Sequence, residues 1–374
     1  MRISYVIPTL DQSGAERQLV LLATGLPSPE FDVQVIALNR GGYYADQLQS
    51  AGIQVHVLEK QFRFDPLTFV RLRRLLRQHS PDIVQSFLFA ANSYVRLPGV
   101  CPARSKVVVS ERCVDSWKSS WQLSVDRWLS RRLDAMTANS NSVSEFYQNI
   151  VGIPETQITV IPNGIPDPRL QPPSATTSLR TELRLPDHAK LIGFVGRLAV
   201  QKCLTDLMWS YQLLRQAVPD VYLVLAGDGP ERDRLAELAC SFGCRDRVFF
   251  LGHRPDAQEI ISQLNVFCLP SSFEGMSNSL MEAMVCGVPV VVSDIGPNLE
   301  LVSNDETGLI FSLGNGPELA KACKRILEDS PLAERLSRNA RELILNRHSV
   351  NDMVNRHVEL YRRLMTNASA AGSG

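Results

Sequence analysis

The sequence predicts an α/β protein built from two Rossmann-like, doubly wound domains, and three observations support this. The chain has 374 residues, which is long for one hydrophobic core and suits two domains. Short runs of Val, Ile and Leu alternate with longer helical stretches, as expected where parallel strands are buried on both faces. The alternation occurs twice, on either side of the Pro-, Gly- and Ser-rich segment IPNGIPDPRLQPPSATTS, which we expect to be a linker.

Thirteen apolar runs are expected to be strands. In the first half they are residues 2–9, 32–38, 54–59, 82–87, 106–110, 135–140 and 158–162. In the second half they are residues 191–196, 221–227, 247–252, 265–270, 289–293 and 308–311. Helical stretches such as 66–79 and 230–242 supply the crossovers that parallel strands need. Two such domains, 1–167 and 168–350, would leave a cleft at the carboxyl ends of both sheets, where ligands bind.

Composition excludes several classes of protein. Lys and Arg together number 39, as do Asp and Glu, so an overall positive field for nucleic acid is absent. No apolar run approaches the length of a membrane-spanning helix, and MRISYVIPTL is expected to be a strand rather than a signal peptide. The eight cysteines are scattered, which indicates reduced thiols in a cytoplasmic protein.

The loop after the first strand, TLDQSGAER, turns into a helix. Gly14 stands at the turn, and Glu16 and Arg17 fall in the first helical turn. Backbone amides at such a helix start attract anions. An ordinary strand-to-helix turn with a capping carboxylate explains the same residues, so this loop alone leaves both interpretations open.

The second half opens with LIGFVGRLAVQK, where a strand ends at Gly196 and two cations follow. Arg197 and Lys202 near a helix start oppose its dipole, so we expect an anion between them, most simply a diphosphate. The alternative is two solvated surface cations. His253 ends another strand at the same edge of the sheet, where it would lie beside a nucleobase or simply in a loop.

Two carboxylates stand eight positions apart in SSFEGMSNSLMEAMVCG. Glu274 precedes the expected helix and Glu282 lies on it, while Ser277 or Asn278 can cap it. Carboxylates accept hydrogen bonds from adjacent hydroxyls, and amides at the helix start can hold phosphate oxygens. A nucleotide sugar satisfies this set, although a surface ion pair at Glu282 and a solvated Glu274 would explain it too.

The chain resembles a retaining glycosyltransferase of the family-4 type with the GT-B fold, two Rossmann-like domains facing across a cleft. The matching pieces are SGAER, SERC, NGI, VGRLAVQK, AGDGPER and FEGMSNSLMEAMVCGVPVVVSD, spread over nearly the whole chain. The last piece, with its E-x7-E spacing, is the most specific. The resemblance also implies that a final helix at about 351–366 crosses back to the first domain.

The resemblance implies a role for each matching residue. Glu274 would contact hydroxyls of the donor hexose, Glu282 the ribose, and Arg197 and Lys202 the diphosphate. The donor-binding set would be Gly14, Gly196, Arg197, Lys202, His253, Glu274, Gly275, Met276, Ser277, Asn278 and Glu282. Glu16, Glu111 and Arg112 would lie on the acceptor side, and the catalytic set would be Arg197, Lys202, Glu274 and Glu111. Ser13 and Cys203 stand where relatives often have glycine, which puts those two loop geometries in doubt.

The expected activity is transfer of a hexose from a nucleotide-diphosphate sugar to a hydroxyl of a glycan or lipid-linked acceptor, with retention, in polysaccharide biosynthesis. We expect a UDP-sugar rather than a GDP-sugar as donor, and no cofactor. Fixed cations and the lack of an Asp-x-Asp motif predict that no metal is required. A nucleotide-sugar epimerase or a non-catalytic nucleotide-sugar-binding protein of the same fold remains the alternative.

Two stretches combine basic and aromatic residues, and basic aromatic helices can lie on an anionic bilayer. They are DPLTFVRLRRLLRQHS, with Phe69, Leu72, Leu75 and Leu76, and WKSSWQLSVDRWLSRRL, with Trp117, Trp121 and Trp128. One hypothesis is therefore peripheral contact with the inner membrane surface, to reach a lipid-linked acceptor. The alternative is that these helices pack their apolar residues on the sheet and leave Arg in water.

Overall fold

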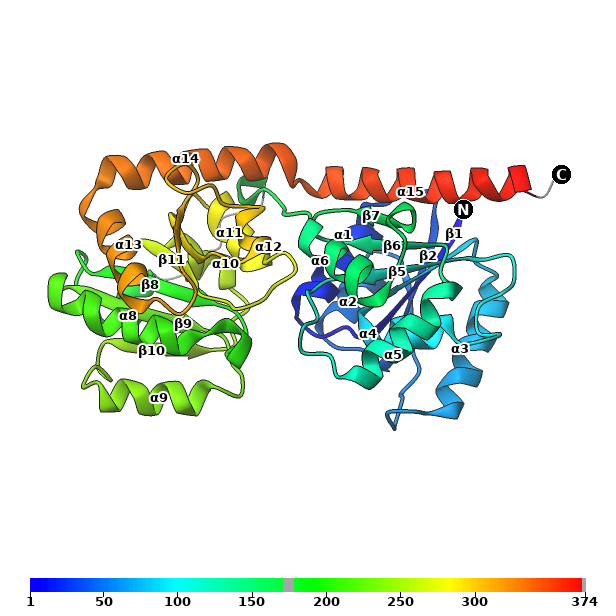
Figure 1. Ribbon diagram of the computed structural model, residues 1–374, viewed down its shortest axis with the longest axis horizontal. Helices are drawn as coiled ribbons and strands as arrows, with labels where there is room; N and C mark the ends of the chain where they lie inside the picture. The colour runs from blue at the N-terminus through cyan, green and yellow to red at the C-terminus, as the bar shows by residue number, and fades with distance from the viewer. Residues whose placement is uncertain (171–177, 372–374) are drawn as a thin grey trace. The chain divides into compact units, whose positions relative to one another are not determined.

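The computed structural model describes residues 1–170 and 178–371, so residues 171–177 of the expected linker lie outside the described part (Figure 1). The chain divides into two compact units. The first unit contains Met1–Gly164 and Val350–Gly374, and the second contains Ile165–Ser349. The boundary therefore falls three residues before the one expected after residue 167.

The first unit is a seven-stranded parallel sheet in the order β3-β2-β1-β4-β5-β6-β7. Its strands are β1 (Arg2–Thr9), β2 (Asp32–Arg40), β3 (Gln54–Val57), β4 (Ile83–Phe87), β5 (Lys106–Glu111), β6 (Ala135–Ala138) and β7 (Ile158–Val160). Its α-helices are α1 (Gly14–Gly25), α2 (Tyr43–Ser50), α3 (Pro66–His79), α4 (Leu88–Arg96), α5 (Ser120–Leu129), α6 (Asn141–Phe146) and α15 (Val350–Ala371).

The second unit is a six-stranded parallel sheet in the order β10-β9-β8-β11-β12-β13. Its strands are β8 (Lys190–Val195), β9 (Val221–Ala226), β10 (Val248–Gly252), β11 (Val266–Leu269), β12 (Val290–Ser293) and β13 (Leu309–Phe311). Its α-helices are α7 (Leu179–Glu182), α8 (Leu204–Ala217), α9 (Arg232–Ser241), α10 (Ala257–Ser262), α11 (Asn278–Val285), α12 (Gly296–Leu299), α13 (Gly316–Glu328) and α14 (Ser330–Arg347).

All thirteen expected strands are confirmed, and both sheets are doubly wound. The strand order reverses between β1 and β4 in the first unit and between β8 and β11 in the second. In such sheets, ligands bind outside the carboxyl ends of the strands at the point of reversal. The loops after β8 and β11 are those that carry the cations and Glu274.

Helix α3 shows how the apolar pattern places the helices on the sheet. Asp65 caps its N-terminus by accepting hydrogen bonds from the amides of Leu67 and Thr68, and Pro66 opens the helix. Leu72 and Leu76 are fully buried, in one core with β1, β2 and α4. The structure thus favours packing of this Leu row on the sheet over exposure to a membrane.

The last helix, α15, belongs to the first unit. Its residues Met353, Val354, Val358 and Tyr361 join the core of β1, β2 and α1. The hydroxyl of Tyr361 lies 3.0 Å from that of Tyr5 on β1. A side chain at Gly25 would meet Val354 at 2.7 Å, so glycine at the end of α1 lets the two helices approach closely.

Candidate active site

Two loops of the second unit meet where the strand order reverses. Strands β8 and β11 pair directly, so the loops that follow them leave the sheet side by side. The amide of Ser272 donates to the carbonyl of Gln201 at 2.9 Å, and the Gln201 side chain donates to the carbonyl of Phe273 at 2.7 Å. These contacts hold the VGRLAVQK loop against the SSFEG loop.

The same contact brings together two residues that sequence analysis assigned to different parts of the donor. Nζ of Lys202 lies 2.5 Å from Oε1 of Glu274, and their side chains are 15% and 8% exposed. An ammonium carries three donors and this ion pair uses one of them. Lys202 can therefore hold a phosphate oxygen while it still orients Glu274.

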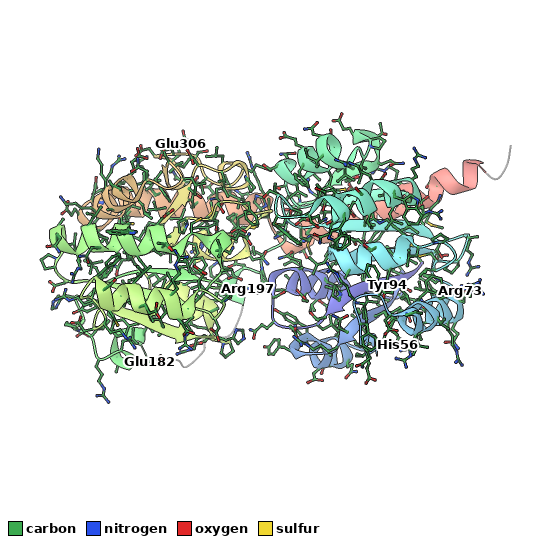
Figure 2. All side chains as sticks on the ribbon, turned by 60° about the horizontal axis from the view of Figure 1, so that its bottom comes forward. His56, Arg73, Tyr94, Glu182, Arg197 and Glu306 are labelled. Atoms are coloured by element: carbon green, nitrogen blue, oxygen red, sulfur yellow. The ribbon has the colours of Figure 1, made fainter. Side chains whose placement is uncertain are left out.

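The loop after β9, AGDGPER, packs against the backbone of the loop that carries Arg197. The amide of Leu198 donates to the carbonyl of Asp228 at 2.9 Å. Gly227 has φ +133°, and a Cβ there would lie 1.9 Å from the carbonyl oxygen of Gly196. Only glycine allows this backbone approach, which fixes the path of the loop from which the exposed Arg197 extends (Figure 2).

Helix α11 begins next to Glu274. Ser277 is its N-cap, with a side chain that accepts from the amide of Leu280 at 3.4 Å, and Asn278 is its first residue. Gly275 and Met276 are buried beside the cap. Glu282 is only 5% exposed and lies in the middle of the helix. Farther along the same edge, His253 follows β10 and is exposed.

The two residues that replace glycine behave differently. Ser13 has φ −139° and is extended, so the doubt about the first loop is removed at this position. Cys203 has φ +47° and ψ 39°, a left-handed conformation that glycine adopts at much lower cost. The loop keeps its glycine-like path, with Cys203 directly after Lys202.

In the first unit, Gly14 is exposed as the first residue of α1, and Glu16 folds back into the turn. Glu16 is 4% exposed. Its carboxylate accepts hydrogen bonds from the hydroxyls of Thr9, at 3.0 Å, and Ser13. One role of Glu16 is therefore to hold the first turn of α1 against the end of β1.

Three of the motifs quoted above are tied together in this unit. Gln18 of α1 donates to the carbonyl of Gly164 and accepts from its amide, each at 2.9 Å. Arg112 donates to the side chain of Asn163, and burial lowers the pKa of its guanidinium to about 10. SGAER, SERC and NGI thus form one connected structure at the carboxyl edge of the first sheet.

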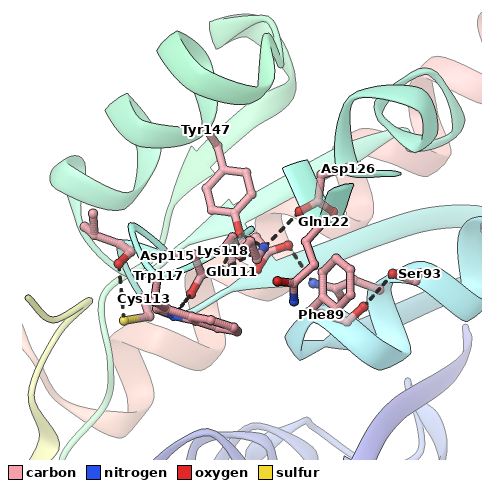
Figure 3. A network of polar contacts seen from close by, with 12 residues as sticks. Phe89, Ser93, Glu111, Cys113, Asp115, Trp117, Lys118, Gln122, Asp126 and Tyr147 are labelled. Atoms are coloured by element: carbon pink, nitrogen blue, oxygen red, sulfur yellow. Dashed lines mark hydrogen bonds and ion pairs between the residues drawn. The ribbon is translucent and has the colours of Figure 1, made fainter. Parts of the chain in front are cut away.

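Glu111, the last residue of β5, lies inside a buried network of charges (Figure 3). It is 3% exposed and accepts a hydrogen bond from the side-chain Nδ2 of Asn92 at 2.9 Å. Burial raises the pKa of its carboxyl to about 7; nearby Lys118 acts in the opposite direction, and Asp126 and Asp115 add to the rise. At neutral pH this carboxyl is therefore partly protonated.

Lys118 is the hub of that network. Its ammonium lies 2.9 Å from both Asp115 and Asp126 and donates to the hydroxyl of Tyr147 at 2.6 Å. Asp126 also pairs with Arg96 at 2.8 Å. Three carboxylates thus face two cations, which leaves one negative charge unmatched when all are ionised.

With this geometry established, the chain can be compared with known proteins. A family model of group 1 glycosyl transferases matches residues 176–343, and a model of glycosyltransferase family 4 matches residues 12–169. The chain belongs to the family-4 type of GT-B glycosyltransferases.

Curated relatives agree with this glycosyltransferase assignment. The chain is 28% identical to a 2-deoxystreptamine glucosyltransferase of Streptomyces kanamyceticus over 64% of its length, which spans 63% of that relative. It is 26% identical to the UDP-Gal:alpha-D-GlcNAc-diphosphoundecaprenol alpha-1,3-galactosyltransferase of Escherichia coli, over 95% of both chains.

Solved structures show the same fold. The complex of Anabaena Alr3699/HepE with UDP is 25% identical, with a TM-score of 0.83, covering 97% of this glycosyltransferase and 100% of that chain. Among the residues described here, no helix is both long and apolar enough to span a bilayer. Within those residues, no group of three or more His, Cys, Asp or Glu side chains is placed to hold a metal ion.

Several residues that build this glycosyltransferase's site were not predicted. Gln201 and Ser272 join the two donor-side loops, Gln18 joins α1 to Gly164, and Lys118 organises the network around Glu111. Each acts through a partner far along the chain, so no local spacing marks it. Only the position of these residues within or beside the quoted motifs could have drawn attention to them.

Proposed function

We propose that the protein is a retaining hexosyltransferase that moves a hexose from a UDP-sugar to a hydroxyl of a glycan or lipid-linked acceptor. The observation that carries the proposal is the Lys202–Glu274 pair at the reversal point between β8 and β11. A cation for phosphate and a carboxylate for sugar hydroxyls stand there within one hydrogen bond of each other. The donor class is supported by a HepE structure containing UDP and by the UDP-Gal named for the Escherichia coli relative.

The proposed donor-side roles are those that the family resemblance implies, and the Lys202–Glu274 contact supports them. Arg197 and Lys202 hold the diphosphate, and amides from Gly275 to Asn278 add hydrogen bonds at the start of α11. Glu274 accepts from hexose hydroxyls and Glu282 from the ribose. In this proposal Gly196 and Met276 shape the floor of this site, and His253 contacts the base.

The proposed reaction breaks the bond between the anomeric carbon and the diphosphate oxygen and forms a bond to the acceptor oxygen on the same face. The acceptor proton passes to the leaving diphosphate oxygen, so UDP departs with it. Lys202 and Arg197 stabilise the negative charge that develops on the diphosphate, as preorganised cations do best. These fixed charges supply what a metal ion would, so we propose that transfer needs neither a metal nor a cofactor.

The acceptor side is assigned to the first unit. Glu111 ends β5 and Arg112 follows it, while Glu16 lies in the first turn of α1, where its carboxylate accepts from Thr9 at the end of β1. In this proposal Glu111 binds an acceptor hydroxyl, Arg112 ties the end of β5 to Asn163, and Glu16 fixes the start of α1. A lipid-linked acceptor would further require a cytoplasmic protein that touches the inner membrane surface.

The test is nucleotide release from a panel of UDP-, GDP- and ADP-sugars, with and without acceptor. Release of UDP that depends on the acceptor supports a transferase. Conversion of the sugar without release of nucleotide would point to an epimerase, and binding without turnover to a non-catalytic binding protein. Either result would overturn the proposal.

Lys202→Ala should lower transfer at least about 100-fold, since removing one preorganised donor costs about 3 kcal/mol of barrier. Lys324→Ala, a 44% exposed cation on α13, is the matched control and should transfer normally. Because Glu274 loses its ion pair in the first variant, circular dichroism and urea unfolding must show that the second unit is still folded. Near-normal transfer by folded Lys202→Ala would remove Lys202 from the mechanism.

A further inference from the structure

The chain has four tryptophans, and Trp117 differs from the other three in what its ring meets. An arginine guanidinium lies over the rings of Trp121 and Trp128, at 4.6 Å and 5.6 Å from their centres. The ring of Trp209 packs on another aromatic ring at 4.6 Å. Within the part of the chain that the structure describes, Trp117 has neither kind of neighbour, and it is 56% exposed. Its indole face is therefore open to a ligand.

Although it is exposed, the indole of Trp117 is held in place by its edge. In the loop between β5 and α5, its Nε1–H donates to Oδ1 of Asp115 at 3.1 Å (Figure 3). Asp115 is itself fixed, because its Oδ2 accepts from the hydroxyl of Tyr147 at 2.7 Å and lies 2.9 Å from Nζ of Lys118. The ring thus presents its face in a fixed direction, so less side-chain freedom is lost when a ligand binds.

The support beneath this loop is rigid. Nζ of Lys118 lies 5.0 Å from the ring centres of both Phe89 and Tyr147, and its side chain is fully buried. The negative faces of these rings attract the ammonium. Directly after the loop, Ser119 and Gln122 form a capping box at the start of α5. The loop is therefore anchored by β5 at one end and by a capped helix at the other.

The same loop follows Glu111, whose carboxylate has capacity for a ligand. Glu111 is 3% exposed, and its Oε1 accepts from Asn92; among the residues described, Oε2 has no hydrogen-bond partner. A buried oxygen without a partner is costly, so Oε2 suits a ligand hydroxyl. Burial raises the pKa of Glu111, and Lys118 and Asp115 then act on this pKa in opposite directions. The residues that fix Trp117 thus also surround Glu111.

We propose that the face of Trp117 is the platform on which the acceptor stacks, and that the acceptor unit is a hexopyranose ring. One face of such a ring consists of C–H groups, which are slightly positive and complement the negative face of an indole. Hydroxyls around the ring can then donate to a carboxylate such as that of Glu111. An open-chain polyol or a hydroxy acid offers hydroxyls without this flat apolar face. The inference rests on the proposed function, because it names the chemistry of that acceptor, but its test does not depend on transfer.

The experiment measures binding of the methyl glycosides of glucose, galactose, mannose and N-acetylglucosamine to the full-length protein in the presence of UDP. No donor sugar is present, so no transfer can occur. Saturation-transfer difference NMR identifies the ring protons that touch the protein. We expect at least one glycoside to bind, with its strongest signals from the C–H groups of one ring face, and we expect no binding of glycerol or malate. Absence of binding by all four glycosides, or equal binding by glycerol, would overturn the proposal.

Tryptophan variants locate the platform. Trp117→Ala should weaken glycoside binding about tenfold, because it removes the stacking surface. Trp117→Phe keeps a ring but loses the N–H that binds Asp115, so it should weaken binding only about threefold. The matched control is Trp128→Ala, which removes a tryptophan of the same unit that is 57% exposed, and it should bind like the wild type. Unchanged binding by Trp117→Ala, or an equal loss in Trp128→Ala, would refute this location.

Two further controls separate the possible outcomes. Because the ring of Trp117 is exposed, its variants should unfold at the same urea concentration as the wild type and keep UDP binding. 1-Hexanol offers an apolar surface without a hydroxylated ring, so displacement of the glycosides by an equal concentration of it would mean that Trp117 takes any apolar group, and the proposal would fail. Glycoside binding through Trp117 without UDP release from any UDP-sugar would count against the proposed function and leave the platform standing.

Discussion

Replacing Glu111 by Gln should make the protein more stable at alkaline pH and less active. Glu111 adds the third carboxylate to a buried network that has only two cations, Arg96 and Lys118. Glutamine has the same shape, and its carbonyl oxygen can still accept from Asn92. The substitution removes the unmatched charge and keeps the hydrogen bond.

The size of the effect follows from the pKa of Glu111, which burial raises from 4.5 to about 7. Because the folded-state pKa lies above the unfolded value, the stabilisation from this group is complete below about pH 4.5 and lost as the pH rises through 7. Each pKa unit corresponds to about 1.4 kcal/mol. The free energy of unfolding of the wild type should therefore fall by about 3 kcal/mol across that pH range. The Gln variant has no proton to lose and should not show this loss.

Thermal and urea unfolding of both proteins at pH 5 and pH 8 measures the difference. From pH 5 to pH 8, the Tm of the first unit should fall by about 6–12 °C more in the wild type than in the variant. This range follows from about 2–4 °C per kcal/mol. Parallel pH profiles for the two proteins would refute the reasoning, because Glu111 would then be ionised in the folded state throughout. If Glu111 binds the acceptor hydroxyl as proposed, transfer falls in the same variant that gains stability.

Three further substitutions test the packing of charges and loops. Lys118→Met leaves the buried Asp115 and Asp126 without their shared cation, so urea unfolding should show a free energy of unfolding lower by about 3–5 kcal/mol. The control Lys106→Met breaks a part-exposed pair with Asp134 and should lower it by at most about 1 kcal/mol. Gly227→Ala puts a Cβ 1.9 Å from the carbonyl oxygen of Gly196 and should lower the free energy of unfolding by about 2 kcal/mol or more. The same variant should lose UDP binding, measured by thermal shift. A variant that binds UDP normally would contradict the role given to this loop. Cys203→Gly relieves a left-handed residue and should raise stability by about 0.5–1 kcal/mol, after allowing for the extra freedom of glycine in the unfolded chain; a loss of stability would mean that Cys203 is not strained.

The strands could be predicted because buried parallel strands leave a local signature. Leu191, Ile192 and Phe194 are fully buried in β8, and such continuous apolar runs occur in few other contexts. The donor-side loops could be predicted for a related reason. In doubly wound sheets, polar residues that directly follow a strand lie at the ligand-binding edge, so Arg197, Lys202 and Glu274 could be proposed for the site from their positions and from the family resemblance.

The pairing of those residues could not be predicted. Lys202 and Glu274 are 72 positions apart, and Gln18 and Gly164 are 146 apart, so no window of sequence contains both partners. The burial of the apolar residues of α3 could not be predicted for a different reason, because some of them face the sheet and others face water. Leu72 and Leu76 face the sheet while Leu67 and Val70 face water, and composition cannot separate the two sets without the phase of the helix.

The two units offset the cost of burying carboxylates in different ways, and this difference bears on the ligand sites proposed for them. A buried charge needs a partner, since desolvation otherwise exceeds what the fold can offset. In the second unit, Glu274 has a single cation at the sheet edge, and that cation keeps two donors for a phosphate. In the first unit, Asp115 pairs with Lys118, and Asp126 pairs with both Lys118 and Arg96, all in the interior of the domain. Lys118 and Arg96 are therefore occupied by carboxylates of the protein itself rather than available to a ligand.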